Sequence, residues 1–273
     1  MHTRTRHRPR GVLGLGIILL MALGLVVAAC GGEKANGPEA GKKTSAGGQQ
    51  GAQVDLPPFP PAPRSTEDSR LRLPSGMSTY EDLLAWVLTD SAAKWQAIFA
   101  EAGEPYSTVY YNLYDRSIGG CEMRLDQTSG PLYCFGDNTI YFPTQWVDSD
   151  TGELMESYGD FAMAIVAAHE VGHHIQLQLG IIEGQYPTRK TELQADCFAG
   201  VWGYSVLGRV EPGDVGEAME ISWDSGDLPG TPKNMPGAHG KPEERVKWFR
   251  TGYDSGDAGE CFALAPLPEE TTG

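Results

Sequence analysis

The run Gly159–Gly180, GDFAMAIVAAHEVGHHIQLQLG, places three histidines and a glutamate in the least polar segment that follows the first 30 residues. Its length and its helix-forming residues predict an α-helix, with Asp160 favouring the N-terminus and Gly180 suiting the C-terminal end. Four helical residues advance about 400°, so His169 and His173 lie about 40° apart and one turn along. Both imidazoles can then reach one Zn²⁺ at about 2.0–2.1 Å.

Glu170 and His174 point in other directions from the same helix. Glu170 is displaced by about 60° from His173, so it flanks the metal without binding it, where a general base for a zinc-activated water belongs. His174 lies about 100° from His173 and points away from the metal, which indicates a supporting or structural role. The alternative is a buried helix that contains histidines by chance, but H-E-x-x-H arises by accident in only about one chain in a hundred of this length.

A catalytic zinc site of this kind needs a third protein ligand and keeps its fourth position for water. The chain has Gln176 and Leu179 where the extended metzincin motif requires glycine and histidine, so that class is excluded. A second helix, predicted over about 188–207, offers Glu192 as the third ligand. Asp196, one turn later on the same face, is placed to accept a hydrogen bond from a ligating histidine. Glu192 alone would equally suit a solvated helix acid; Asp196 and the preceding motif favour the ligand.

Helices dominate the rest of the pattern, with a small sheet ahead of the histidine helix, which indicates an α+β fold. Ser78 and Glu81 form a capping box that opens a first helix. The stretches Ser107–Tyr114 and Pro131–Phe142 are rich in β-formers, and GDN in the latter predicts a turn between two short strands. We expect Thr139–Phe142 to be a sheet edge that binds substrate backbone as an added strand. Further helices are predicted over about 214–223 and 242–253.

The first 30 residues have the character of an export signal. A basic stretch, HTRTRHRPR, precedes 19 uncharged residues, GVLGLGIILLMALGLVVAA, that end at Cys30. The sequence VAAC resembles a bacterial lipobox, in which the cysteine is lipidated and becomes the first residue of the mature protein. This pattern favours a lipid-anchored, outward-facing protein of the bacterial cell membrane. The apolar run is close to the length of a membrane span, so an uncleaved anchor is the alternative.

Residues 31–74 are rich in Gly, Pro, Ala, Lys and Gln, which predicts a disordered, flexible tether with a stiffer Pro-rich end. The folded domain is expected over 75–265, followed by a tail at 266–273. Without residues 1–30, which hold four basic residues and no acid, the chain has 17 basic and 36 acidic residues and a formal charge of −19. Such a charge argues against nucleic acid or anionic lipid as a partner.

Four cysteines remain beyond Cys30, an even number that suggests two disulfides in an exported protein. Three pairings are open. We favour Cys121–Cys134, which closes a short loop, together with Cys197–Cys261, which ties the C-terminal end to the core. Free buried thiols are the alternative.

Three motifs together resemble the bacterial putative neutral zinc metallopeptidase family: GDFAMAIVAAHEVGHHIQ, ELQADCFAG and HGKPEERVKWFRTGYDSGD. The stretch GPLYCFGDNTIYF is similar to that family's Cys-containing hairpin, and the resemblance covers nearly all of Ser75–Phe262. It implies a mostly helical, zincin-like domain of the gluzincin kind. It also implies that His169, His173 and Glu192 bind zinc and that Glu170 is catalytic.

His239 is the remaining candidate for the catalytic site. It begins the last of the three motifs, in which the family often has a Thr-Ser pair after His-Gly, whereas this chain has Lys241 and Pro242. His239 either hydrogen-bonds the oxyanion, as an outlying histidine does in similar enzymes, or forms a His-Gly turn before a helix. The sequence leaves both roles open.

These features predict an extracytoplasmic, membrane-anchored zinc metallopeptidase that hydrolyses peptide or protein substrates. The alternative is a zinc-binding surface lipoprotein without catalysis, which acts as a structural or binding module. Glu170 argues against the alternative, because a purely structural zinc site has no need of a general base.

Overall fold

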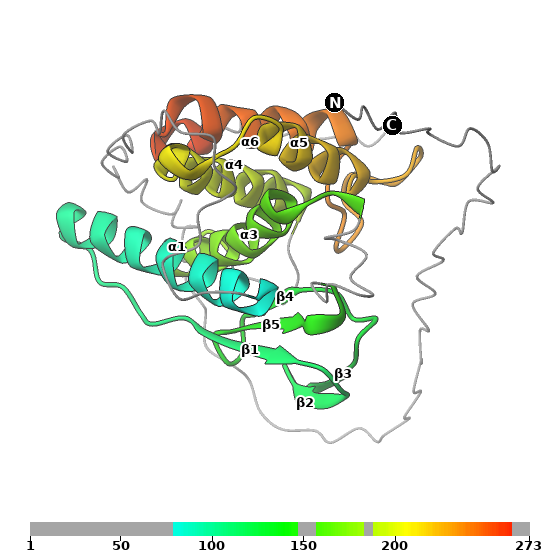
Figure 1. The fold of residues 1–273 in the computed structure, drawn as a ribbon. Helices are drawn as coiled ribbons and strands as arrows, with labels where there is room; N and C mark the ends of the chain where they lie inside the picture. The colour runs from blue at the N-terminus through cyan, green and yellow to red at the C-terminus, as the bar shows by residue number, and fades with distance from the viewer. Residues whose placement is uncertain (1–78, 147–156, 183–187, 264–273) are drawn as a thin grey trace, which may run out of the picture. The chain divides into compact units, whose positions relative to one another are not determined.

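The structure is a computed structural model that describes residues 79–146, 157–182 and 188–263 (Figure 1). The predicted leader with Cys30, the predicted tether 31–74 and the tail 266–273 lie outside the described residues, and the predicted domain boundaries stay predictions. Within the described ranges, no helix is both long enough and apolar enough to cross a membrane.

The order of elements confirms the expected α+β class, with a small sheet ahead of the histidine helix (Figure 1). The helices are α1 (Tyr80–Ala102), α3 (Asp160–Gln178), α4 (Arg189–Ser205), α5 (Asp214–Asp224) and α6 (Pro242–Ser255). The strands are β1 (Tyr110–Tyr114), β2 (Ile118–Gly120), β3 (Met123–Leu125), β4 (Leu132–Cys134) and β5 (Thr139–Pro143). Short 3₁₀ turns are η1 (Thr144–Trp146), η2 (Leu207–Arg209) and η3 (Ala258–Phe262).

The sheet has the strand order β1-β5-β4, so β5 lies in the centre. It pairs in parallel with β1, Tyr110 opposite Thr139, and antiparallel with β4, Leu132 opposite Tyr141. The predicted hairpin around GDN is therefore confirmed. The expectation that Thr139–Phe142 forms an open edge is wrong, because both sides of β5 are hydrogen-bonded to neighbouring strands.

The strands β2 and β3 form a separate antiparallel hairpin that the sequence did not predict. Its two-residue turn is made by Cys121 and Glu122, both with positive φ, at 51° and 57°. Such turns normally show glycine or asparagine, which tolerate this backbone conformation. The usual sequence signal for a hairpin is therefore missing here.

The start of α1 lies one residue later than the predicted capping box. Thr79 is the N-cap: its hydroxyl accepts a hydrogen bond from the Asp82 amide at 3.1 Å, and the Asp82 carboxylate accepts one from the Thr79 amide at 3.2 Å. Ser78 of the predicted Ser78–Glu81 pair lies outside the described residues, and the N-cap of α1 is Thr79. Both pairs have the same three-residue spacing, so the sequence pattern alone does not separate them.

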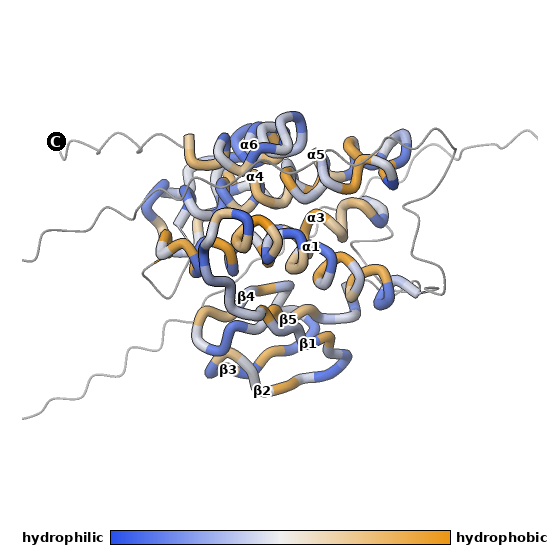
Figure 2. Tube along the Cα trace, turned by 90° about the vertical axis from the view of Figure 1, so that its left-hand side faces the viewer, coloured by the Kyte–Doolittle hydropathy of each residue, from blue (hydrophilic) through white to orange (hydrophobic). Residues whose placement is uncertain are grey.

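The elements are stacked in layers, with the sheet at one side, α1 and α3 over it, then α4, and α5 and α6 outermost (Figures 1 and 2). Hydrophobic and hydrophilic stretches alternate along α1, as expected for a helix with one buried face (Figure 2). Almost every residue of α3 is buried, because neighbouring elements cover it on all sides. Trp202 on α4 links this core to α1 by donating to the Asp90 carboxylate at 2.9 Å.

Two glycines allow α4 and α6 to pack closely. A Cβ added to Gly252 would lie 1.9 Å from the Cys197 carbonyl oxygen, and one added to Gly200 would lie 2.2 Å from the Phe249 carbonyl oxygen. Gly200 therefore faces α6. The small residue that allows α4 to approach α3 is Ala195, opposite Gly172.

Both predicted disulfides are present. Cys121–Cys134 joins the β2–β3 turn to β4, and Cys197–Cys261 joins α4 to η3 at the end of the described chain. The second bond closes the longer loop, with a sequence separation of 64 residues against 13. Closing a longer loop removes more conformational entropy from the unfolded chain, so the second disulfide is expected to stabilise the folded state more than the first.

Three carboxylates meet where α3 and α5 begin. Asp160, Asp214 and Glu217 bring carboxylate oxygens within 4.8 Å of one another. Glu217 accepts a hydrogen bond from the Phe161 amide, and Asp214 accepts one from the Glu211 amide. Burial, together with the neighbouring negative charges, raises the pKa of Asp214 to about 7.

The close approach of α4 and α6 predicts that Gly252→Ala destabilises the fold. The added methyl meets backbone that has no room to move, and overpacking of this kind costs about 1–3 kcal/mol in the free energy of unfolding. Gly216→Ala in α5 is the control, because its Cβ would meet nothing within 4 Å. There we expect stabilisation by about 0.5–1 kcal/mol. Urea denaturation measures both; equal stability of the two variants would contradict the packing argument.

The raised pKa of Asp214 predicts a stability that falls as pH rises. The folded state holds a proton that the unfolded chain releases near pH 4, so this contribution is complete below pH 4 and is lost as pH approaches 7. Asp214→Asn removes the titrating group. The midpoint temperature of its thermal unfolding, measured from pH 4 to pH 8, should therefore fall less than that of the wild type. Asp254→Asn, on the exposed face of α6, should behave like the wild type. Parallel curves for all three proteins would refute this assignment.

Candidate metal centre

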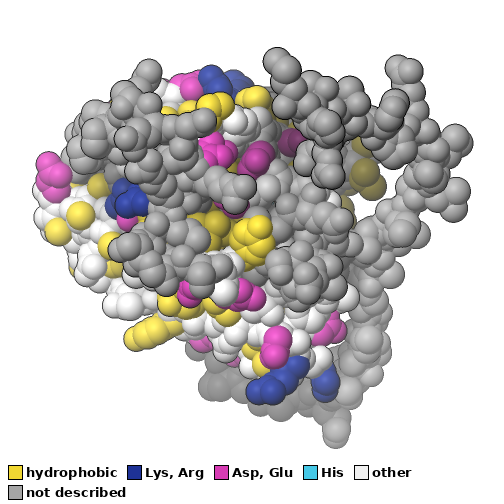
Figure 3. Space-filling model, viewed as in Figure 1, with side chains coloured by type: hydrophobic (Ala, Val, Ile, Leu, Met, Phe, Trp, Pro, Cys, Tyr) yellow, Lys and Arg dark blue, Asp and Glu magenta, His cyan; other side chains and the backbone are white. Residues whose placement is uncertain are grey.

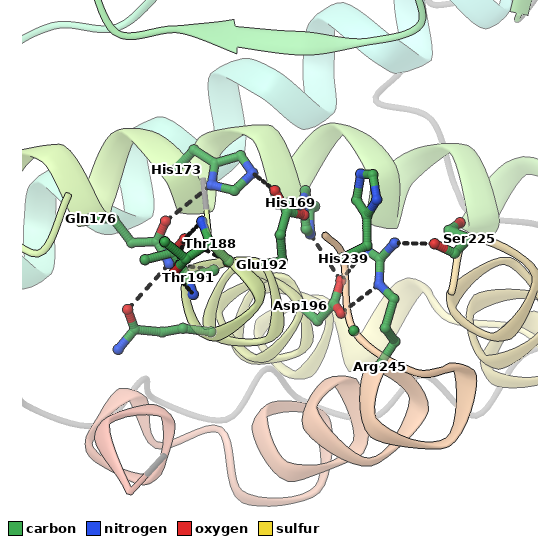
Figure 4. Close-up of polar contacts among 12 residues, drawn as sticks. His169, His173, Gln176, Thr188, Thr191, Glu192, Asp196, Ser225, His239 and Arg245 are labelled. Atoms are coloured by element: carbon green, nitrogen blue, oxygen red, sulfur yellow. Dashed lines mark hydrogen bonds and ion pairs between the residues drawn. The ribbon is translucent and has the colours of Figure 1, made fainter. Parts of the chain in front are cut away.

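Two helices bring the predicted metal ligands together. His169 and His173 project from successive turns of α3 toward Glu192 on α4 (Figure 4). The Nε2 atom of His169 lies 3.2 Å from one Glu192 carboxylate oxygen, and the Nε2 atom of His173 lies 3.5 Å from the other. All three side chains are buried, and their nearest ligand atoms lie within 4.8 Å of one another.

This arrangement fits a zinc ion. Ligand atoms at about 2.0–2.1 Å from a tetrahedral metal are separated from one another by about 3.3 Å. The two observed nitrogen–oxygen separations lie on either side of that value. Two imidazoles and one carboxylate are also a donor set that zinc takes in hydrolytic sites, with the fourth position left for water.

His169 is oriented by a carboxylate behind it. Its Nδ1 atom lies 2.9 Å from Oδ1 of Asp196, the contact that the sequence predicts for a ligating histidine. Asp196 in turn accepts two hydrogen bonds from the Arg245 guanidinium, at 2.8 and 2.7 Å. Arg245 also donates to the Ser225 carbonyl oxygen at 3.0 Å. Sequence reasoning missed Arg245, because it lies on α6 and no spacing along α3 or α4 points to it.

His173 is oriented by an amide. Its Nδ1 atom lies 3.0 Å from Oε1 of Gln176, one turn further along α3. The Gln176 amide nitrogen donates to the Thr191 carbonyl oxygen and to Gln194, so its oxygen faces the imidazole. Both ligand histidines thus have an acceptor at Nδ1, which leaves Nε2 for a metal. The three-residue spacing between His173 and Gln176 is the signal in the sequence that could have pointed to this contact.

The charges in the centre favour a cation. Burial lowers the pKa of His169, but the hydrogen bonds and charges of Asp196 and Glu192 outweigh burial and raise that pKa to about 10. Burial opposes ionisation of Glu192, yet the imidazoles of His173 and His169 lower its pKa overall. The group therefore stabilises a positive charge between its members, as a proton or a metal cation supplies.

Glu170 lies beside the ligands and between two hollows. The larger hollow, of about 360 Å³, also reaches the β2–β3 turn, β4 and the Cys121–Cys134 disulfide. The smaller one, of about 160 Å³, is lined on its other sides by α5 and by apolar side chains of α3. Only 7% of Glu170 is exposed, and within the described ranges its carboxylate has no hydrogen-bond or ion-pair partner. Its oxygens are not sealed from the hollows, so the carboxylate is placed to exchange a proton with a molecule bound there.

His239 lines both hollows from the segment that leads into α6. Figure 4 shows its imidazole directed toward α3, beside His169. Its backbone amide donates to Asp227, as does that of Gly240, which has a φ of 98°. The structure contains both features that the sequence suggested: a His-Gly turn before α6 and a histidine near the predicted ligands. The catalytic role of His239 stays a prediction.

His174 lies away from the metal ligands. Its Nδ1 atom is 3.1 Å from the Tyr133 hydroxyl on β4, and its Nε2 atom is 2.9 Å from the Ser107 carbonyl oxygen. Burial lowers its pKa to about 4, so the ring is neutral at pH 7. Through these contacts His174 connects α3 to the sheet.

Sequence comparison identifies a protein family whose model covers the residues of this site. A family model described as "Putative neutral zinc metallopeptidase" matches residues 57–264. The uncharacterized protein YpfJ of Escherichia coli is 34% identical over 199 residues, which cover 64% of this chain and 68% of that protein. An uncharacterized protein of Mycobacterium tuberculosis, Rv2575, is 32% identical over 191 residues, or 59% of this chain and 65% of the relative. The chain thus spans about two thirds of these relatives. No solved structure matches it significantly.

The contact between His169 and Asp196 predicts that Asp196→Asn weakens zinc binding by about 10–100-fold, the usual effect of removing such a partner. Competition with a chromophoric chelator measures the affinity. Asp254→Asn, in an exposed ion pair of α6, is the matched control and should bind zinc like the wild type. The change also removes the anion that faces Arg245, so thermal unfolding is recorded alongside. A folded Asp196→Asn protein with unchanged affinity would contradict the assigned role.

Proposed function

The chain belongs to this zinc metallopeptidase family, and on that basis we propose that it hydrolyses peptide bonds at the centre formed by His169, His173 and Glu192. The observation that carries the proposal is the Glu170 carboxylate, which lines both hollows beside the three predicted ligands and has no hydrogen-bond or ion-pair partner in the described part of the chain. A site that only bound zinc would not need such a group.

Each residue then has a distinct task. Zinc held by the two histidines and Glu192 would supply a Lewis acid that polarises the scissile carbonyl and acidifies a water. Glu170 takes a proton from that water and passes it to the leaving amine. Asp196 and Gln176 keep the two ligand imidazoles in the tautomer that presents Nε2. His239, at the junction of the two hollows, donates a hydrogen bond to the carbonyl oxygen as negative charge develops there.

Strand β4 is the surface proposed to hold the substrate backbone. It is an outer strand of the three-stranded sheet, and Leu132, Tyr133 and Cys134 line the larger hollow beside the ligands. An extended peptide that pairs with an outer strand gains main-chain hydrogen bonds that do not depend on its sequence. The sequence predicted this role for Thr139–Phe142, which the structure places in the central strand β5. We propose β4 instead.

The proposed setting is the outer face of a bacterial cell membrane, with Cys30 as the lipidated anchor and a peptide or protein as substrate. The N-terminal basic and apolar stretches and the VAAC sequence support this setting. Two disulfides are in keeping with an oxidising compartment. The strongly acidic composition argues against nucleic acid as a partner.

The mechanism predicts that Glu170→Gln keeps zinc but loses hydrolysis. Glutamine has the same shape and cannot act as a base, so kcat/KM should fall by about 10²–10⁴-fold, the usual contribution of a general base. Glu101→Gln, at an exposed position of α1, is the control. Zinc content by mass spectrometry and cleavage of a fluorogenic peptide library are the two measurements.

Undiminished hydrolysis in Glu170→Gln would refute the assigned mechanism. A wild-type protein that holds one zinc per chain and cleaves no peptide in the library would instead support the surface zinc-binding lipoprotein.

A further inference from the structure

We propose that the turn of the β2–β3 hairpin selects the substrate, and that Glu122 gives the enzyme a preference for lysine or arginine in the larger hollow. The inference rests on the proposed peptidase function and adds a substrate class to it. It begins from an unusual turn beside the metal ligands.

The turn has a backbone conformation that its residues do not favour. Cys121 and Glu122 are its two central residues, and their φ values of 51° and 57° belong to the left-handed region. Non-glycine residues adopt that region at a cost in free energy, and positions of this kind cluster at functional sites. Such a turn persists only where the surrounding structure holds it.

Contacts with the neighbouring sheet hold the turn in place. The Cys121–Cys134 disulfide joins it to β4, the strand proposed to carry the substrate. The Cys121 amide donates to the Asp137 carboxylate at 3.4 Å, and the Tyr141 hydroxyl donates to the same carboxylate at 2.7 Å. Gly120 sits so close to the Tyr141 ring that an added Cβ would lie 2.5 Å from it. The position of Glu122 relative to β4 is therefore fixed before substrate binds.

Glu122 and the next residue, Met123, line the larger hollow together with His169, Glu170 and His173. Glu122 is exposed, and its carboxylate has no hydrogen-bond or ion-pair partner within the described ranges. Met123 is 49% exposed, although it is a large apolar side chain. A free carboxylate next to an uncovered apolar side chain matches a lysine or arginine, whose aliphatic stem and cationic head need one partner each.

The charge around the hollow points the same way. No lysine or arginine is among the described residues that line it. Figure 3 shows both acidic and basic side chains on the visible face of the molecule, including its sheet end, so the preference is assigned to the lining of the hollow and not to the wider surface. The smaller hollow differs in having an arginine, Arg245, in its described lining. The guanidinium of Arg245 is already hydrogen-bonded to Asp196 and to the Ser225 carbonyl oxygen.

The test compares kcat/KM for two peptides that differ only in one flanking side chain, lysine or the uncharged norleucine of similar length, at each position near the cleavage point. We expect the wild-type zinc enzyme to prefer lysine by about five-fold at one position, the upper range for an exposed ion pair. In Glu122→Gln the ratio of kcat/KM for the lysine peptide to that for the norleucine peptide should fall to about one. The preference should also decline as salt is added.

Glu122→Gly is the second variant, because glycine suits the φ of 57° while lacking the carboxylate. Loss of the lysine preference in both variants supports the proposal, since the glycine variant keeps the turn. A preference that survives in either variant, or wild-type cleavage of both peptides at equal rates, overturns the specificity assignment and leaves the peptidase function standing. Failure of the wild-type zinc enzyme to cleave any peptide overturns both.

Discussion

The buried contact between Asp196 and Arg245 joins the candidate metal centre to the helical layers. One carboxylate on α4 faces the guanidinium of α6 on one side and the His169 imidazole of α3 on the other. A buried carboxylate is costly unless charged donors surround it, and these two groups supply them. Arg245 also donates to Ser225 at the end of α5. The position of the His169 imidazole, a predicted metal ligand, is thus set by the packing of four helices.

The sequence was most informative where residues share one helix. His169 with His173, and Glu192 with Asp196, are each four residues apart, and helix geometry turns that spacing into a common direction. The contacts of Arg245 and Gln176 were missed for a different reason. Arg245 reaches Asp196 from a separate helix, and the orientation of the Gln176 amide depends on Thr191 across the α3–α4 interface. Such contacts depend on tertiary packing, which spacing along one helix does not contain.

The sheet shows the same division between local and distant information. The β4–β5 hairpin was predictable, because its turn signal and β-forming residues are neighbours in sequence. The central place of β5 was not, since it depends on parallel pairing with the distant β1. The β2–β3 hairpin lacked a signal altogether, because Cys121 and Glu122 occupy turn positions that glycine and asparagine normally mark.

Because the predicted ligands lie on separate helices, an incomplete chain cannot assemble the site. His169 and Glu192 lie on different helices, and the arginine that supports them lies on α6, near the end of the fold. A nascent or partly folded chain has no assembled ligand set, because these segments have not yet docked. Under the proposed function, hydrolytic capacity would therefore require these helices to have docked. An unfinished chain would then be latent without a separate inhibitor, and it would pose no proteolytic threat to the machinery that handles it.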